Sequence, residues 1–437
     1  MSSSSSNHNN AVLSTQSFIE FTSFDSAIQS RLATLRDFEP TESPARPSFV
    51  VRAPGRVNLL GEHVDYSGFG VMPMAVASDV SVRVSFPTSG GLTFDNVEAR
   101  FEEKVYGTLE AEQLAVDLDN HHWSHYVLCG YKAAFDAFAK KGLTPPSLKP
   151  LRLTVYGNVP AGSGLSSSSA LVVASTLAVA AAYDIPVTRT EVAVAAIEGE
   201  RHVGTMSGGM DQSASILGQA GKGLYIQFVP SLTASPVTLP PGVTFVICNC
   251  LKKKEKAVDA SQYYNKRVVE CRLAALLLAK ANSVPLAGVK TLRDVLDALA
   301  SGPEEYQERM TSLASYCASQ SASSPTLTLP AVAEILGKPT ASDILPSYFS
   351  DRAEQVKDVF EDSDTFIVWD RARHVFEESL RVMSASAADL VGEGFGKVMC
   401  DSHASCRDLF GCSCPELDAL VSASMESGAL GSRLAGA

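Results

Sequence analysis

Residues 155–171 read Val155-Tyr-Gly-Asn-Val-Pro-Ala-Gly-Ser-Gly-Leu-Ser-Ser-Ser-Ser-Ala-Leu171, and the rest of the chain is organised around them. Before the glycines, apolar and polar residues alternate from Leu151 to Tyr156, which predicts a strand with one buried face. After them, residues 170–183 are almost wholly apolar and rich in alanine, which predicts a buried helix. Glycine lets the backbone approach a ligand closely, and a helix N-terminus carries about half a unit of positive charge. The stretch therefore predicts a phosphate-binding site.

The same loop also fits a turn whose serines cap the following helix. It lacks the Gly-Lys-Ser/Thr ending of a Walker loop, and the protein-kinase motifs are missing from the chain. A nucleotide site here needs a loop of another kind.

Composition narrows the class of protein. The chain has 437 residues, 45% of them hydrophobic, which is enough for two or three domains, and its net charge of −12 argues against a nucleic-acid partner. No apolar run reaches about 18 residues, the length that a membrane-spanning helix needs. The Ser/Asn-rich N-terminus lacks the hydrophobic core of a signal peptide. We expect a cytoplasmic protein with a disordered tip at residues 1–17 and no membrane partner. The spacing of Cys406, Cys412 and Cys414 disfavours a metal site.

Charged residues crowd into an otherwise apolar segment at Pro54-Gly55-Arg56-Val-Asn58-Leu-Leu-Gly61-Glu62-His63-Val-Asp65-Tyr66. A surface turn with solvated charges is one interpretation. The apolar flanks favour a second one, in which Arg56, Glu62, His63 and Asp65 border a core and bind the hydroxyl groups of a small polar ligand.

A third segment, Gly208-Gly-Met-Asp211-Gln212, places a carboxylate beside two glycines at the start of a helix. Asp211 is either a helix N-cap or a catalytic acid or base. Trp123 and Tyr126 share a helical face and are either core residues or a platform for a purine ring.

Two further expectations concern the second half of the chain. Residues 224–228 and 243–248 are predicted to be strands. Residues 301–330 are rich in serine and threonine and weakly apolar, which predicts a loop or an inserted segment of low order.

These three motifs together resemble a known family. The segment 54–66 closely resembles the galactokinase signature, residues 160–170 resemble the ATP-binding motif of the wider GHMP family of small-molecule kinases, and residues 208–212 resemble its catalytic aspartate loop. The late Ser402-His-Ala-Ser-Cys-Arg-Asp408 points to the galactokinase and N-acetylgalactosamine kinase branch. The resemblance implies an α+β, two-lobed GHMP kinase fold of mixed sheets packed with helices, with the active site in the cleft between lobes. Residues 18–215 would form the N-terminal lobe and 216–437 an incomplete C-terminal lobe.

The resemblance also implies a reaction, namely ATP-dependent phosphorylation of the anomeric hydroxyl of a sugar. Asp211 would be the base or orienter, and Arg56 would keep it ionised and steady the moving phosphoryl group. The sugar would be bound by Glu62, His63, Asp65, Gly208 and Tyr264. ATP would be bound by Trp123, Tyr126, Pro160, Gly162, Ser163, Gly164, Leu165, Ser166, Ser167 and Ser168. Mg²⁺ would be held by Ser168 and Glu200.

Tyr264 lies where galactose-specific relatives carry a tyrosine, which favours galactose over N-acetylgalactosamine. The carboxylates of the segment 54–66 disfavour mevalonate or homoserine. The chain ends at Ser432-Arg-Leu-Ala-Gly-Ala437, where relatives continue into a third glycine-rich motif. An alternative is therefore a catalytically impaired regulator that binds sugar and ATP. The expected partners are these two small molecules, and the expected state is a monomer.

Overall fold

The computed structural model describes residues 12–13, 48–118, 120, 122–143, 147–252, 260–387 and 392–436. Unit 1 comprises residues 1–56, 75–204 and 211–220, and unit 2 comprises residues 57–74, 205–210 and 221–437. Each unit is therefore assembled from separate stretches of chain, and the lobe boundary after residue 215 stays a prediction from the sequence. Of the tip predicted at residues 1–17, all but Val12 and Leu13 lie outside the described residues.

The strand predicted before the glycine loop is β6 (Leu151–Gly157), in the middle of a mixed five-stranded sheet. The strand order is β2 (Phe49–Leu60), β3 (Met72–Ser85), β6, β4 (Leu92–Asn96) and β5 (Lys104–Tyr106). β6 is antiparallel to β3, with Val155 opposite Val82, and parallel to β4, with Leu153 opposite Phe94. All four side chains are buried, which explains the alternation seen in the sequence.

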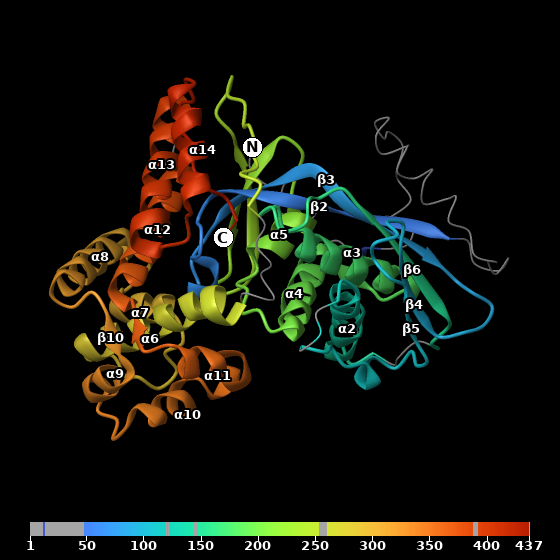
Figure 1. The fold of residues 1–437 in the computed structure, drawn as a ribbon, viewed down its shortest axis with the longest axis horizontal. Helices are drawn as coiled ribbons and strands as arrows, with labels where there is room; N and C mark the ends of the chain where they lie inside the picture. The colour runs from blue at the N-terminus through green and yellow to red at the C-terminus, as the bar shows by residue number, and fades with distance from the viewer. Residues whose placement is uncertain are drawn as a thin grey trace. The chain divides into compact units, whose positions relative to one another are not determined.

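The helices of unit 1 are α2 (Ser124–Lys140), α3 (Ser167–Ala182), α4 (Arg189–Glu200) and most of α5 (Met210–Leu217). The alanine-rich α3 is buried along almost its whole length, as the sequence predicted. It packs against α2 and α4, beside which it lies in Figure 1. Gly130 allows the close approach, because a Cβ there would lie 2.5 Å from Cβ of Ser175. The short strand β7 (Val187–Thr188) pairs with β1 (Val12–Leu13).

Unit 2 has a hairpin followed by a largely helical assembly. The hairpin strands are β8 (Lys222–Gln227) and β9 (Thr233–Thr238). The helices are α6 (Lys266–Ala281), α7 (Leu292–Leu299), α8 (Tyr306–Ser323), α9 (Leu329–Leu336), α10 (Ile344–Tyr348), α11 (Ala353–Asp362), α12 (Val368–Ala387), α13 (Gly392–Ser405) and α14 (Pro415–Glu426), with β10 (Leu327–Thr328) paired to β11 (Thr365–Phe366). The buried α6 packs against α7, α9 and α12, and α12 packs against α8 (Figure 1).

The prediction of a low-order segment at residues 301–330 is wrong, because α8 occupies most of this stretch. Its buried residues Met310, Leu313, Ala314 and Cys317 recur at helical spacing and supply an apolar stripe. Its hydroxyl groups donate to the carbonyl four residues earlier, as Ser315 does to Thr311 at 2.9 Å. A narrow apolar stripe is enough for a helix when a neighbouring element covers it and the hydroxyl groups form hydrogen bonds within the helix.

The two predicted strands have different outcomes. The strand predicted at residues 224–228 is β8, which begins two residues earlier and ends one residue earlier than predicted. The strand predicted at residues 243–248 is absent from the described structure, where this stretch is neither helix nor strand. Val246 and Ile247 are 78% and 47% exposed, so an alternating pattern alone did not provide the hydrogen-bonded neighbour that a strand requires.

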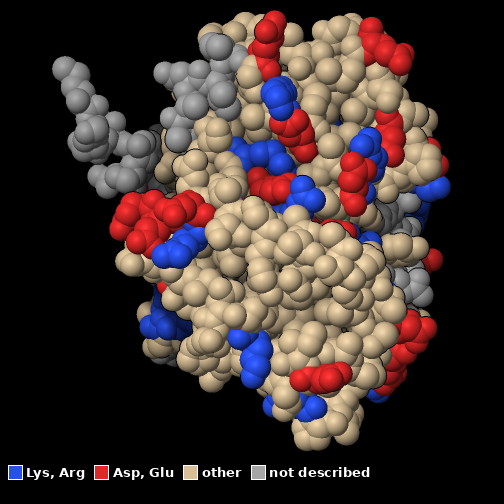
Figure 2. Space-filling view, turned by 90° about the vertical axis from the view of Figure 1, so that its left-hand side faces the viewer, with Lys and Arg blue, Asp and Glu red and all other residues tan. Residues whose placement is uncertain are grey.

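On the face that Figure 2 draws, acidic and basic side chains are interspersed. Several helices of unit 2 carry ion pairs between residues four apart, among them Arg293 with Asp297, Arg373 with Glu377 and Lys397 with Asp401. These pairs neutralise charge locally. In the described part of the chain, no helix combines the length and the apolar character needed to cross a membrane.

Candidate active site

The loop between β6 and α3 has the backbone of an anion-binding nest. Gly162, Gly164 and Ser166 have φ of 68°, 76° and 59°, whereas the intervening residues are not in the left-handed region. Such alternation turns successive N–H groups toward one side, where they can bind an anion. Ser166 is the N-cap of α3 but makes no capping hydrogen bond with its side chain. The N–H groups of the first turn are thus left for a ligand.

A buried ion pair lies beside this loop, within unit 1. Asp211 Oδ1 accepts from Arg56 Nε at 2.8 Å and lies 2.7 Å from Arg56 Nη2. Arg56 Nη1 donates to the carbonyl of Gly164 at 2.5 Å, and the Arg56 amide donates to that of Leu165 at 3.1 Å. Arg56 is 1% exposed and Asp211 9%. The structure therefore brings together two residues 155 positions apart and joins both to the glycine loop.

Glu200 and Ser168 also belong to unit 1. Glu200 ends α4, is buried, and accepts from Gln212 Nε2 at 2.5 Å. Ser168 lies in the first turn of α3 and is half-buried. A hydroxyl and a carboxylate are oxygen ligands of the kind Mg²⁺ prefers, and Mg²⁺ usually takes few protein ligands together with substrate phosphates and water. The donor chemistry of Ser168 and Glu200 fits this ion.

Trp123 and Tyr126 lie at the start of α2 and are both half-exposed. Trp123 Nε1 donates to the carbonyl of Glu102 at 3.0 Å, and its ring lies 5.9 Å from that of Phe101. The indole is therefore held in place from one side while part of its surface stays open. Neither residue is part of the fully buried core, which favours the platform interpretation.

In unit 2, β2 ends in a turn at Gly61, whose φ is 96°, and the chain then places three polar residues in a buried setting. Glu62, His63 and Asp65 are 3%, 5% and 9% exposed, so the interpretation as solvated charges is wrong. Asp65 accepts from the amide of Tyr66 at 3.0 Å and from that of Met210 at 3.1 Å. The signature is thus bonded to the segment that leads into Asp211.

Aromatic rings surround His63, which is itself in the left-handed region with a φ of 59°. Its ring stacks on Phe410 with centroids 4.6 Å apart and lies 5.6 Å from the ring of Tyr264. His63 Nδ1 is 3.1 Å from the hydroxyl of Tyr66. Burial raises the pKa of Tyr66, which keeps that phenol protonated. Tyr264, from the π-helical turn at Ala260–Asn265, is therefore brought to the signature residues.

Gly208 has no room for a side chain. A Cβ at this position would lie 2.3 Å from the amide nitrogen of Tyr66 and 2.4 Å from Cγ of Asp65. The segment 205–210 can therefore approach the signature only because residue 208 is glycine.

Sequence reasoning missed three residues whose buried side chains support this cluster, namely Glu378, His374 and Arg433. Glu378 Oε1 accepts from the Gly61 amide at 2.8 Å, and His374 Nε2 is 3.0 Å from the carbonyl of Glu62. Burial alone would raise the pKa of Glu378, but the guanidinium groups around it outweigh burial and hold the value at about 2. The available signal was a glutamate among the apolar residues of the stretch that forms α12.

His374 should make folding sensitive to acid. Burial lowers its pKa from 6.5 to about 4, so the unfolded chain binds a proton in this interval that the folded chain does not. We expect the free energy of unfolding to fall by about 3 kcal/mol as the pH drops from 6.5 towards 4. In His374→Gln the fall in stability over this interval should be smaller by about this amount. Urea unfolding of both proteins from pH 7.5 to 4.5 measures it, and identical pH slopes would contradict the assignment.

A glycine loop at a helix start and a buried Arg56–Asp211 pair suit the transfer of a phosphoryl group to a small molecule. Residues 125–219 match the family model described as the GHMP kinases N terminal domain. Residues 37–86 match the model described as the galactokinase galactose-binding signature. Fold and site thus define a GHMP-type kinase.

Two relatives cover most of the chain. A galactokinase of Dictyostelium discoideum is 39% identical over an alignment of 417 positions, which covers 90% of this chain and 79% of that protein. A galactokinase of Saccharomyces cerevisiae is 34% identical over 444 residues, covering 90% and 81%. The chain belongs to the galactokinase family. The solved structure of Lactococcus lactis galactokinase complexed with galactose shares the fold, with a TM-score of 0.60 over 94% of this chain and 87% of that chain at 21% identity.

Proposed function

We propose that this protein is an ATP-dependent sugar 1-kinase that phosphorylates the anomeric hydroxyl of galactose, a reaction of galactose catabolism. Membership of the galactokinase family supports the class of reaction. The single observation that carries the mechanism is the buried ion pair of Arg56 and Asp211, which is hydrogen-bonded to the carbonyl of Gly164 in the glycine loop.

Asp211 orients the attacking hydroxyl and accepts its proton as the bond from the sugar oxygen to the γ-phosphorus of ATP forms, while the bond from that phosphorus to ADP breaks and ADP leaves. Arg56 holds the carboxylate through Oδ1 and offers its positive charge to the phosphoryl group in transit. Burial strengthens both interactions, because the local dielectric constant is far below that of water. Alignment and charge neutralisation are the main requirements of phosphoryl transfer, so few groups are needed.

The nest binds the phosphates of ATP. Its backbone amides and the N-terminus of α3 supply directed donors and a positive field. Mg²⁺, held by Ser168 and Glu200, would neutralise charge on the phosphates. Trp123 and Tyr126 provide the aromatic surface for adenine. The remaining residues proposed to bind ATP are Pro160, Gly162, Ser163, Gly164, Leu165, Ser166 and Ser167.

The sugar-binding residues proposed for unit 2 are Glu62, His63, Asp65, Gly208 and Tyr264. The two carboxylates accept hydrogen bonds from hydroxyl groups, and the aromatic rings around His63 hold the imidazole in place. Gly208 contributes by its missing side chain, which allows the backbone to lie against Asp65. Arg56 is followed directly by the segment that carries Glu62, so the chain itself links the proposed catalytic and sugar-binding residues.

A coupled assay of ADP release tests the proposal. Galactose should support turnover with Mg²⁺ and ATP, and the product should carry its phosphate at C1. N-acetylgalactosamine should react much more slowly, since the named relatives are galactokinases. If N-acetylgalactosamine reacts faster than galactose, the substrate is N-acetylgalactosamine. Binding of galactose and ATP without ADP release would identify a regulator instead.

We also expect the protein to be a monomer and to act in the cytoplasm, where ATP is available. Size-exclusion chromatography tests the oligomeric state.

A further inference from the structure

Glu62 uses one of its two carboxylate oxygens within the protein. Oε2 accepts from Arg433 Nη2 at 2.7 Å, from Asn58 Nδ2 at 3.2 Å and from the Gly436 amide at 3.3 Å. Among the residues that the structure describes, none donates a hydrogen bond to Oε1. The side chain is only 4% exposed. Glu62 therefore presents a single directed acceptor.

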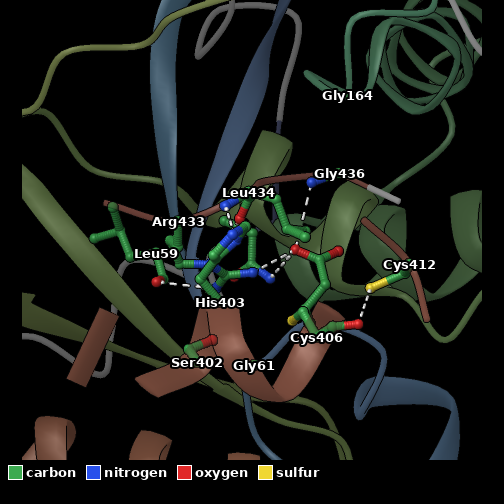
Figure 3. A network of polar contacts seen from close by, with 12 residues as sticks. Leu59, Gly61, Gly164, Ser402, His403, Cys406, Cys412, Arg433, Leu434 and Gly436 are labelled. Carbon is green, nitrogen blue, oxygen red and sulfur yellow. Dashed lines mark hydrogen bonds and ion pairs between the residues drawn. The ribbon is translucent and has the colours of Figure 1, made fainter. Parts of the chain in front are cut away.

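Arg433 is the charged donor to Glu62. Its guanidinium also donates through Nη1 to the carbonyl of Leu59 at 3.0 Å and through Nε to that of Leu434 at 2.7 Å. Figure 3 shows it among these groups, beside His403. The side chain of Arg433 is 1% exposed and all three of its guanidinium nitrogens make polar contacts, so the guanidinium is held in one orientation. A planar guanidinium fixed in this way also fixes the plane of its carboxylate partner.

Glu378 lies on the other side of the guanidinium, with Oε1 3.9 Å from Arg433 Nη1. The same oxygen accepts from the Gly61 amide at 2.8 Å and from Ser402 Oγ at 2.7 Å. One buried guanidinium is thus paired with two buried carboxylates, and the carboxylate of Glu378 accepts from the backbone amide that precedes Glu62. Both the backbone and the carboxylate of the sugar signature depend on this arrangement.

We propose that Arg433 is a positioning residue that saturates Oε2 of Glu62 and turns Oε1 toward the sugar, so that the protein demands a hydroxyl donor at one position of the substrate. The proposal rests on the proposed function of Glu62 in sugar binding. A sugar without that hydroxyl leaves a buried, charged acceptor unsatisfied, which is the situation in which proteins discriminate most strongly. A carboxylate free to rotate could use either oxygen or recruit water, and would discriminate less.

The test compares galactose with its 2-, 3-, 4- and 6-deoxy analogues. For each analogue, the penalty is the factor by which kcat/KM falls when that hydroxyl group is removed from galactose. Glu62→Gln identifies the hydroxyl group that Glu62 binds, because the penalty for removing that group should be smaller in this variant. Arg433→Met should shrink the same penalty by about tenfold or more, raise KM for galactose by a similar factor and leave KM for ATP within about twofold. Arg433→Lys, which keeps the charge but not the planar fork, should recover part of the discrimination.

Arg373→Met is the matched control, because it removes an Arg–Glu ion pair with Glu377 on α12 that does not touch Glu62. It should leave every penalty unchanged. The proposal is overturned if Arg433→Met keeps the wild-type penalty, or if the penalties at all four positions fall equally, which indicates general damage. If Arg433→Met does not fold, Arg433→Lys alone decides between these outcomes.

Hydrogen exchange of the ligand-free protein separates this inference from the proposed function. In the Arg433 variants, the amides of Gly61 and Gly436 should exchange about tenfold faster or more, because their acceptors are no longer held. Unchanged exchange overturns the anchoring role whatever the substrate is. If the wild type fails to bind galactose in calorimetry while exchange responds as expected, the substrate is wrong and the anchoring stands.

Discussion

Replacing Asp211 with asparagine is expected to lower kcat by about a thousandfold, because an amide cannot accept the proton of the attacking hydroxyl. The variant should fold, since the asparagine Oδ1 can still accept from Arg56 Nε, and Arg56 keeps its hydrogen bond to Gly164. Binding of ATP should therefore change by no more than about threefold. Single-turnover kinetics with galactose and calorimetry with ATP measure the two effects.

Asp95→Asn is the matched control in the same unit. Asp95 is also 9% exposed and also pairs with an arginine, since its Oδ2 accepts from Arg152 Nη1 at 2.9 Å. It lies in β4, which β3 and β6 separate from β2, the strand that carries Arg56. Its loss should leave kcat close to the wild-type value. A kcat for Asp211→Asn within tenfold of wild type would remove Asp211 from the mechanism.

Replacing Gly208 with alanine should have the second large effect. The added Cβ would lie 2.3 Å from the backbone nitrogen of Tyr66 and 2.4 Å from Cγ of Asp65, and a backbone atom cannot move aside as the end of a side chain can. We expect KM for galactose to rise about a hundredfold and stability to fall by about 1–3 kcal/mol. Affinity for ATP should be nearly unchanged, because the residues proposed to bind it belong to unit 1.

Gly107→Ala controls for the substitution itself, because a Cβ at Gly107 meets nothing within 4 Å. It should be kinetically silent. Wild-type KM for galactose in Gly208→Ala would show that Asp65 is displaced without consequence, and would argue against its role in binding the sugar.

Local patterns predicted much of the fold. The strand, glycine loop and buried helix around residues 155–182 were predicted because alternation, glycine and alanine act over a few neighbouring residues. Patterns failed where a distant partner decides. The serine-rich α8 is a helix because its narrow apolar stripe is covered, and residues 243–248 do not form a strand because none of the described segments pairs with them.

The sequence by itself determined the family, the phosphate loop and the residue types of the candidate site, since these are written in three short motifs. Only the tertiary structure decided which groups hold those residues in place. Arg433 and Glu378 lie 371 and 316 residues from Glu62, yet Arg433 donates to its carboxylate and Glu378 accepts from its amide. No local pattern encodes such pairing, because a buried charge finds its partner through the packing of the chain and not through spacing along it.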